Sequence, residues 1–487
     1  MKTNLAAGAI IAAVAVSAVE FYRTGNVLES LEALVAGIVA AGIAALAFSL
    51  RGITWRGLVT GGFFVGAGVL SWTFSETKLI VWGFLAAEGI VFMVLAWPWL
   101  RDLRTLPRIG GVWLGIGYWI IGVAGALLML KVGIAAQRVA YLGVFALAVL
   151  AVLASTRRDR DLTVGIVAAF LYAIAALTMA GSGEMFDDLH AVPSTGWGEN
   201  MEHRFWGGEW LLYHPNSLGM LALVVVVRIG PSGAFSKVQR VGAVAIGAWF
   251  IYLTNSRTAF IFAAAAAVVY AVLLWWRTRR PVVDLAVERR PWLAAATPFI
   301  ALLLIFAVSG GTGGFLMQER HDGGGVTSGR LDTWKQVFTD WRDGPVVEKA
   351  FGSTRDSRAT VYRESSGEDV KLTTDNAAVG ALRRGGVLGV AAFLVGLYLL
   401  LRHAGVWRML REAPAVLRRR EVSTPTAPAW LAILAISMLP TIMTSDWLLG
   451  GTGGTLWILL LAAEAAVLLA ATAAPDDTPA EPAPSFP

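Results

Sequence analysis

Apolar segments long enough to cross a lipid bilayer recur along nearly the whole chain, and this recurrence constrains the fold more than any other feature of the sequence. A helix needs about 20 such residues to span the hydrocarbon core, where the backbone must satisfy its hydrogen bonds internally. The 487 residues are 56% hydrophobic and only 15% charged, whereas roughly a quarter of a soluble protein is charged. We therefore expect an all-α polytopic membrane protein.

About fourteen segments meet this criterion of length and apolarity. They lie near residues 4–21, 31–50, 56–73, 78–98, 110–131, 138–155, 162–181, 215–229, 240–254, 257–276, 293–309, 376–401, 427–444 and 454–472. The first segment also has the composition of a signal peptide, whose removal would leave the sidedness of every later loop unchanged. We expect a transmembrane domain over residues 1–472 and a disordered, Pro- and Ala-rich cytoplasmic tail over residues 473–487.

The basic residues indicate which loops face the cytoplasm. One alternate set of loops contains more than half of the 40 Lys and Arg residues, all in short connections such as "RDLRTLPR" and "RTRRPVVDLAVERR". By the positive-inside rule these loops and both termini are cytoplasmic. The net charge of +6 is therefore a topology signal, and no nucleic-acid partner is needed to explain it.

The opposite, extracytoplasmic face has a loop at 182–214, a short turn at 254–257 and one long polar loop at 310–375. The long loop exceeds what a simple connection needs, so we expect it to be functional. Its stretch "GRLDTWKQVFTDWRD" has the apolar period of an amphipathic helix, which we expect to lie across the membrane face and cap a cavity. The apolar face of this helix consists of Leu331, Trp334, Val337, Phe338 and Trp341.

Four polar stretches fall at the predicted extracytoplasmic face. Arg257 enters its helix from this side, and a lone arginine costs about 3 kcal/mol at the centre of a membrane helix but less near the interface. Its side chain would reach the lipid headgroups, pair with a carboxylate such as Asp446, or hold a bound phosphate. The four stretches are "YHPNSLG" (213–219), "TNSRTAF" (254–260), "SGRLDTW" (328–334) and "TTDNAAVGALRRGGVLGV" (373–390).

These stretches resemble the motifs of the O-antigen ligase and polymerase superfamily, over about residues 210–395. Its members tend to show H-P-N at the start of one helix, S-R two helices later, G-R-x-x-x-W in the large extracytoplasmic loop, and H-N or D-N before a helix with spaced glycines. The matching positions are His214-Pro215-Asn216, Ser256-Arg257, Gly329-Arg330 with Trp334, and Asp375-Asn376 with Gly386 and Gly389. The chain departs from the ligase pattern at Asp375, where ligases carry His.

The resemblance implies transfer of a glycan from a polyprenyl-diphosphate carrier to a glycan or lipid acceptor, outside a bacterial cytoplasmic membrane. Arginine suits a diphosphate because it is permanently charged and binds phosphate oxygens in a bidentate manner. The expected diphosphate ligands are Arg257, Arg330, Arg383 and Arg384, although the last two would also reach the headgroups. Asn216, Ser256, Asn376 and Trp334 are expected to support them. No cofactor or metal is expected, and the absence of cysteine excludes disulfide bonds and thiolate metal sites.

The acceptor hydroxyl needs a general base, since its proton must leave as the new bond forms. Asp375 stands where the resemblance places the ligase His, but "TTDN" before an apolar run also predicts a helix cap. His214 is the second candidate, and its alternative role is to bond the loop backbone at a helix entry that begins with Pro215. His321, beside several glycines, is a weaker candidate.

Several functions compete for this pattern. Because Asp375 replaces the ligase His, a polymerase is favoured over a ligase. A secondary transporter or a flippase for lipid-linked oligosaccharides is the alternative from another class, but its usual signal is ionisable residues in mid-membrane positions, and those are scarce here. Asp159 and Asp161 match the D-x-D pattern of nucleotide-sugar transferases, yet they lie in a short cytoplasmic loop, so we set that function aside.

Overall fold

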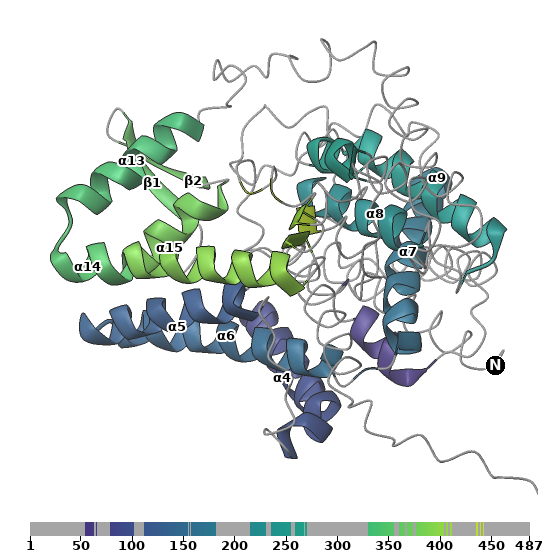
Figure 1. Ribbon diagram of the computed structural model, residues 1–487, viewed down its shortest axis with the longest axis horizontal. Coiled ribbons are helices and arrows are strands. Elements are labelled where there is room, and N and C mark those ends of the chain that lie inside the picture. Colours follow the sequence, from purple (N-terminus) through teal and green to yellow (C-terminus); the bar gives the residue numbers. More distant parts are fainter. Residues whose placement is uncertain are drawn as a thin grey trace, which may run out of the picture.

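The computed structural model describes part of the chain, drawn in colour in Figure 1. The described residues are 54–62, 65, 78–101, 112–153, 155, 157–181, 215–229, 235–254, 259–266, 268–269, 330–354, 360–365, 368–373, 376–403, 406–407, 410–411, 435–436, 439 and 442. Most of them are helical, as the sequence predicts.

The helices form two groups (Figure 1). In one group α5 packs against both α6 and α15, and α6 also packs against α4. In the other group α7, α8 and α9 pack together. The helix bounds are α4 (Lys78–Arg101), α5 (Val112–Leu128), α6 (Val132–Leu153), α7 (Arg157–Gly181), α8 (Pro215–Ile229), α9 (Lys237–Leu253), α13 (Arg330–Asp343), α14 (Val346–Phe351) and α15 (Ala377–His403).

Two helix starts differ from the predicted spans. The expected spans at 138–155 and 162–181 correspond to α6 and α7, which begin earlier, at Val132 and Arg157. The hydropathy pattern placed the boundaries too late because α6 carries Arg138 in its second turn and α7 carries charged residues in its first turn. Those charges are buried: Arg138 is 0% exposed in α6, and Asp159 is 3% exposed in α7.

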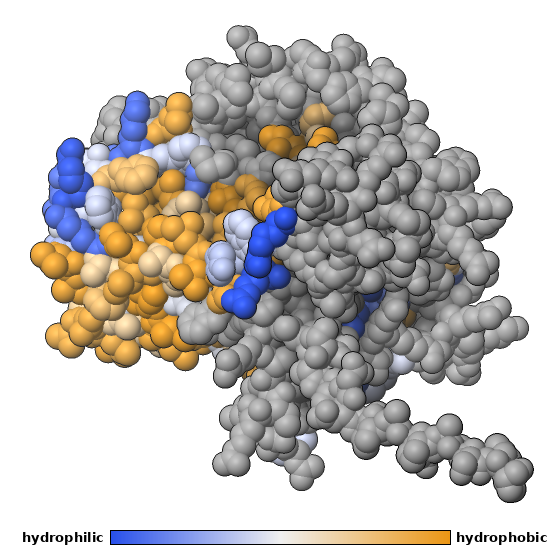
Figure 2. Space-filling view, viewed as in Figure 1, coloured by the Kyte–Doolittle hydropathy of each residue, from blue (hydrophilic) through white to orange (hydrophobic). Residues whose placement is uncertain are grey.

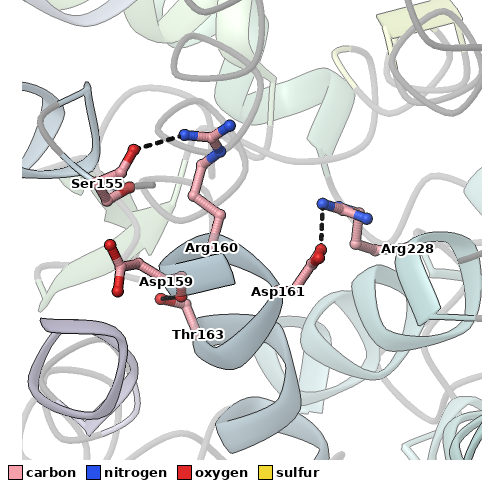
Figure 3. Close-up of polar contacts among 6 residues, drawn as sticks. All are labelled: Ser155, Asp159, Arg160, Asp161, Thr163 and Arg228. Carbon is pink, nitrogen blue, oxygen red and sulfur yellow. Dashed lines mark hydrogen bonds and ion pairs between the residues drawn. The ribbon is translucent and has the colours of Figure 1, made fainter. Parts of the chain in front are cut away.

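The buried charges of α7 tie it to its neighbours (Figure 3). Asp161 forms an ion pair with Arg228 of α8 at 2.6 Å. Asp159 accepts a hydrogen bond from Thr54, and Arg160 donates to the Ser155 carbonyl at 2.8 Å. These contacts give the D-x-D stretch a packing role between helices, in agreement with setting aside the nucleotide-sugar function.

Two of the described helices are long and apolar enough to cross a membrane, over Val132–Val152 and Ala377–Arg402. Figure 2 shows a broad hydrophobic surface over the region that α5, α6, α14 and α15 occupy in Figure 1. Leu128, Leu130 and Val132, at the turn between α5 and α6, are 61%, 85% and 66% exposed. In water such a surface would promote aggregation, whereas lipid tails would cover it. The number of about fourteen spans, and their sidedness, stay predictions.

The long loop contains one element that the sequence analysis does not predict. β1 (Thr360–Ser365) pairs antiparallel with β2 (Glu368–Thr373), with Thr360 opposite Thr373 and Ser365 opposite Glu368. The Thr, Val and Tyr residues of "TVYRES" favour a strand, and the two intervening residues, Ser-Gly, suit a tight hairpin. This hairpin adds to the predicted helices of the loop, and α13 lies against it.

Candidate functional site

Two of the four predicted polar stretches meet where α13 packs on the first turns of α15. Val337 of α13 is 3% exposed and forms a small apolar cluster with Val379 of α15, and Trp334 packs against it. The predicted apolar face of α13 is therefore only partly used, since Leu331 and Phe338 remain 48% and 50% exposed. The contact holds Trp334 and Val337 of α13 beside the first turns of α15. Whether α13 also caps a cavity stays a prediction.

Asn376 is the N-cap of α15. Its side-chain oxygen accepts hydrogen bonds from the backbone N–H groups of Ala378 at 2.9 Å and Val379 at 3.0 Å. This is the pattern that satisfies the unpaired N–H groups of a first helical turn. Asp375 lies outside the described residues, so its own predicted role as a cap stays a prediction.

Helix α15 is interrupted at Gly386, whose backbone has φ 61° and ψ −157°. A left-handed φ favours glycine because it has no Cβ. A Cβ at Gly386 would also lie 2.5 Å from the Lys349 carbonyl oxygen of α14. The family-type glycine at this position thus permits a helix break and a backbone contact with α14.

Arg383 and Arg384 stand directly before this break. The Arg383 carbonyl accepts a hydrogen bond at 2.6 Å from the backbone N–H of Ser353, and its side chain is partly exposed. Arg384 is 2% exposed, and its Nε donates to the Gly380 carbonyl at 3.3 Å. The reading in which Arg384 extends to the lipid headgroups is therefore wrong, because the protein encloses its side chain. Of the two, Arg383 is better placed to meet a ligand.

The sequence analysis missed Arg138, which lies beside this break. Its Nη1 donates to the Gly122 carbonyl of α5 at 2.6 Å, and its Nη2 donates to the Ser353 carbonyl at 2.8 Å. An arginine in the second turn of an apolar helix was the available signal. The predicted span at 138–155 puts Arg138 at its edge, whereas the structure buries the side chain.

The remaining predicted site residues lie wholly or partly outside the described residues. Pro215 is the first residue of α8, as predicted, and Arg330 is the first residue of α13. The side chains of Asn216 and Arg330 lie outside the described part. The residues wholly outside it are His214, Ser256, Arg257, His321, Asp375 and Asp446.

Among the described residues, two helices are long and apolar enough to cross a membrane, and one of them, α15, carries Arg383 and Arg384 before its break. Residues 242–394 match the family model described as O-antigen ligase. This match covers less than half of the chain, and over that range it confirms the resemblance to the O-antigen ligase and polymerase superfamily drawn from the motifs. Comparisons with curated proteins and with solved structures give no match.

The matched range contains most of the candidate site. It includes Ser256-Arg257, Arg330 with Trp334, Asp375-Asn376 and the break in α15. His214 lies before the matched range, as does Arg138.

Proposed function

We propose that the protein is a membrane glycosyltransferase that transfers or polymerises glycan units from a polyprenyl-diphosphate carrier. The observation that carries this proposal is the packing of α13, which begins with Arg330, on the α15 segment that contains Arg383 and Arg384. All of these residues lie within the range that matches the O-antigen ligase family.

The proposed reaction exchanges one bond at the anomeric carbon of the donor sugar. The bond to the diphosphate oxygen breaks, and the diphosphate leaves with the electron pair. The acceptor hydroxyl oxygen forms the new bond and gives its proton to a base. Arginines stabilise the charge that develops on the leaving diphosphate, and this role is assigned to Arg257, Arg330 and Arg383. Arg384, which is buried, contributes a positive charge nearby.

Asp375 is the favoured base. It directly precedes Asn376, whose side chain already caps two N–H groups of α15, and this supports a role for Asp375 other than capping. A carboxylate at this position would accept the proton of the acceptor hydroxyl. His214 is the second candidate and lies outside the matched range.

The proposed site faces the outside of the bacterial cytoplasmic membrane. In the proposed topology α5 ends on that side and α15 begins there. A contact supports placing the end of α5 on the same side as the start of α15. Gly125, near the end of α5, contacts Phe351 of α14, which lies in the predicted extracytoplasmic loop. Residues 1–472 form the transmembrane domain in this proposal, with residues 473–487 as a cytoplasmic tail.

Deletion of the gene, followed by gel analysis of surface glycans, tests the reaction. A polymerase, which we favour because Asp375 replaces the ligase His, predicts loss of long chains while single repeat units stay attached. Accumulation of complete lipid-linked chains that are not attached would instead identify a ligase. Unchanged surface glycans would contradict both forms of the proposal.

A further inference from the structure

We propose that Arg138 is a positioning residue, which holds the end of α14 in the break of α15 and thereby sets the position of Arg383. Arg138 lies in α6, before the range that matches the family. Its effect on donor binding rests on the proposed function, whereas its effect on the contact between α14 and α15 does not.

Ser353 connects Arg138 to α15. The Ser353 carbonyl accepts a hydrogen bond from Arg138 Nη2 at 2.8 Å. The N–H of the same residue donates to the Arg383 carbonyl at 2.6 Å. This carbonyl stands just before Gly386, where the helical conformation is interrupted. A continuous series of hydrogen bonds therefore runs from a fully buried guanidinium to the backbone of a proposed diphosphate ligand.

Arg138 also bonds to α5, which packs against α15 on the other side of the contact between α14 and α15. Its Nη1 donates to the carbonyl of Gly122 in α5 at 2.6 Å. A Cβ at Gly122 would lie 3.0 Å from the Arg384 carbonyl oxygen and 3.1 Å from Arg138 Nη1. One guanidinium thus bridges α5 and the 352–354 segment, and α15 lies against the same glycine. A single planar group with several donors suits this bridge better than an ammonium does.

Glycines bring these backbones unusually close. Gly352 has φ 90°, and a Cβ there would overlap the Arg384 carbonyl group. A Cβ at Gly125 would lie 2.5 Å from Phe351 Cβ. Little side-chain volume separates α5, the end of α14 and α15. We therefore expect hydrogen bonds between their backbones to set the distances between them. Without the hydrogen bonds that Arg138 donates, α14 would move relative to Arg383, and α13 with Trp334 would move with it.

A labelling experiment tests the contact itself. The chain has no cysteine, so Ser353→Cys introduces a single thiol without removing the two backbone hydrogen bonds. In full-length protein purified in detergent, Arg138→Ala should raise the maleimide labelling rate of this thiol about tenfold, because local opening exposes it. Arg138→Lys, which keeps the charge and is the safer variant for folding, should raise the rate less. An unchanged rate in both variants would overturn the proposal.

Two controls separate a local effect from general loosening. Val346→Cys, on a residue that is 80% exposed, should label at the same rate with and without Arg138. Arg228→Ala breaks a buried ion pair elsewhere in the described structure and should leave the labelling of Ser353→Cys unchanged. An equal increase with Arg228→Ala would show that Arg138 acts only on overall stability, and would overturn the positioning role.

Binding of undecaprenyl diphosphate to the same preparations tests the consequence for the donor. Arg138→Lys should raise the Kd about tenfold, since a small displacement of a binding group has a large effect. A merely structural arginine would lower the Tm of the unliganded protein and leave the Kd of the folded fraction unchanged. If the wild-type protein does not bind this lipid, the proposed function fails, and the labelling rates still decide the contact.

Discussion

Asp375, the proposed base, directly precedes Asn376, whose side chain caps α15. The Asn376 side-chain oxygen holds two N–H groups of α15. A substitution at Asp375 therefore changes the proposed base without removing the helix cap, and a substitution at Asn376 does the opposite. This separation makes the chemistry testable residue by residue.

We expect Asp375→Asn to lower glycan transfer by about 10²–10⁴-fold, the usual contribution of a general base. The Tm should stay near that of the wild type, since Asn376 still caps the helix. Asn376→Ala is the matched control, and it should cost about 1 kcal/mol of stability. Transfer assays and thermal unfolding on both variants measure these effects. An active Asp375→Asn enzyme beside an inactive His214→Gln enzyme would move the base to His214.

At the scale of elements, the break in α15 is the feature on which the site geometry depends. Gly386 combines a left-handed φ with close contact to the α14 backbone. Both conditions exclude a side chain. They explain in physical terms why a glycine stands two residues after Arg384.

Gly386→Ala should therefore destabilise the protein by about 2–5 kcal/mol, from backbone strain and overpacking together. Gly143→Ala in α6 is the matched control, because a Cβ there would meet no atom within 4 Å. The control should be neutral or slightly stabilising, since alanine favours a helix. Thermal unfolding in the same detergent gives the Tm of each variant for comparison. Equal midpoints would contradict the strain assigned to Gly386.

The sequence predicts the elements whose signals are local. The expected span at 215–229 agrees with α8, and the amphipathic period at "GRLDTWKQVFTDWRD" agrees with α13. The starts of α6 and α7 were missed because buried contacts satisfy Arg138 and Asp159, and hydropathy cannot show such partners. The break at Gly386 also depends on a tertiary contact, with the backbone of α14. The motifs predicted that α13 and α15 belong to one site, but not how they pack.

At the scale of the whole molecule, the predicted topology decides whether the site can meet its substrate. The hydrophobic surface in Figure 2 fits lipid contact around α5, α6 and α15. The polar helix α13 packs at the first turns of α15. This arrangement fits the proposal that the reaction takes place near the membrane surface.

Single cysteines introduced into the cysteine-free chain should test this topology in intact cells. Residues 182–214 and 310–375 should react with a membrane-impermeant maleimide from outside. Residues 277–290, which carry five arginines in the predicted cytoplasmic set, should react only after the cells are opened. Labelling of 310–375 from the cytoplasmic side alone would contradict the proposed location of the site.

Glycan transfer by arginine variants tests the central claim most directly. In a deletion strain, Arg257→Ala and Arg330→Ala should abolish transfer at normal protein levels, and lysine should restore little because it lacks the bidentate fork. Arg342→Ala is the control, since this arginine of α13 is 71% exposed and pairs with the adjacent Asp343; it should keep wild-type glycans. Gel analysis of surface glycans measures transfer, and immunoblots measure the protein level. Full transfer by the Arg257→Ala and Arg330→Ala proteins would contradict a diphosphate site built from these arginines.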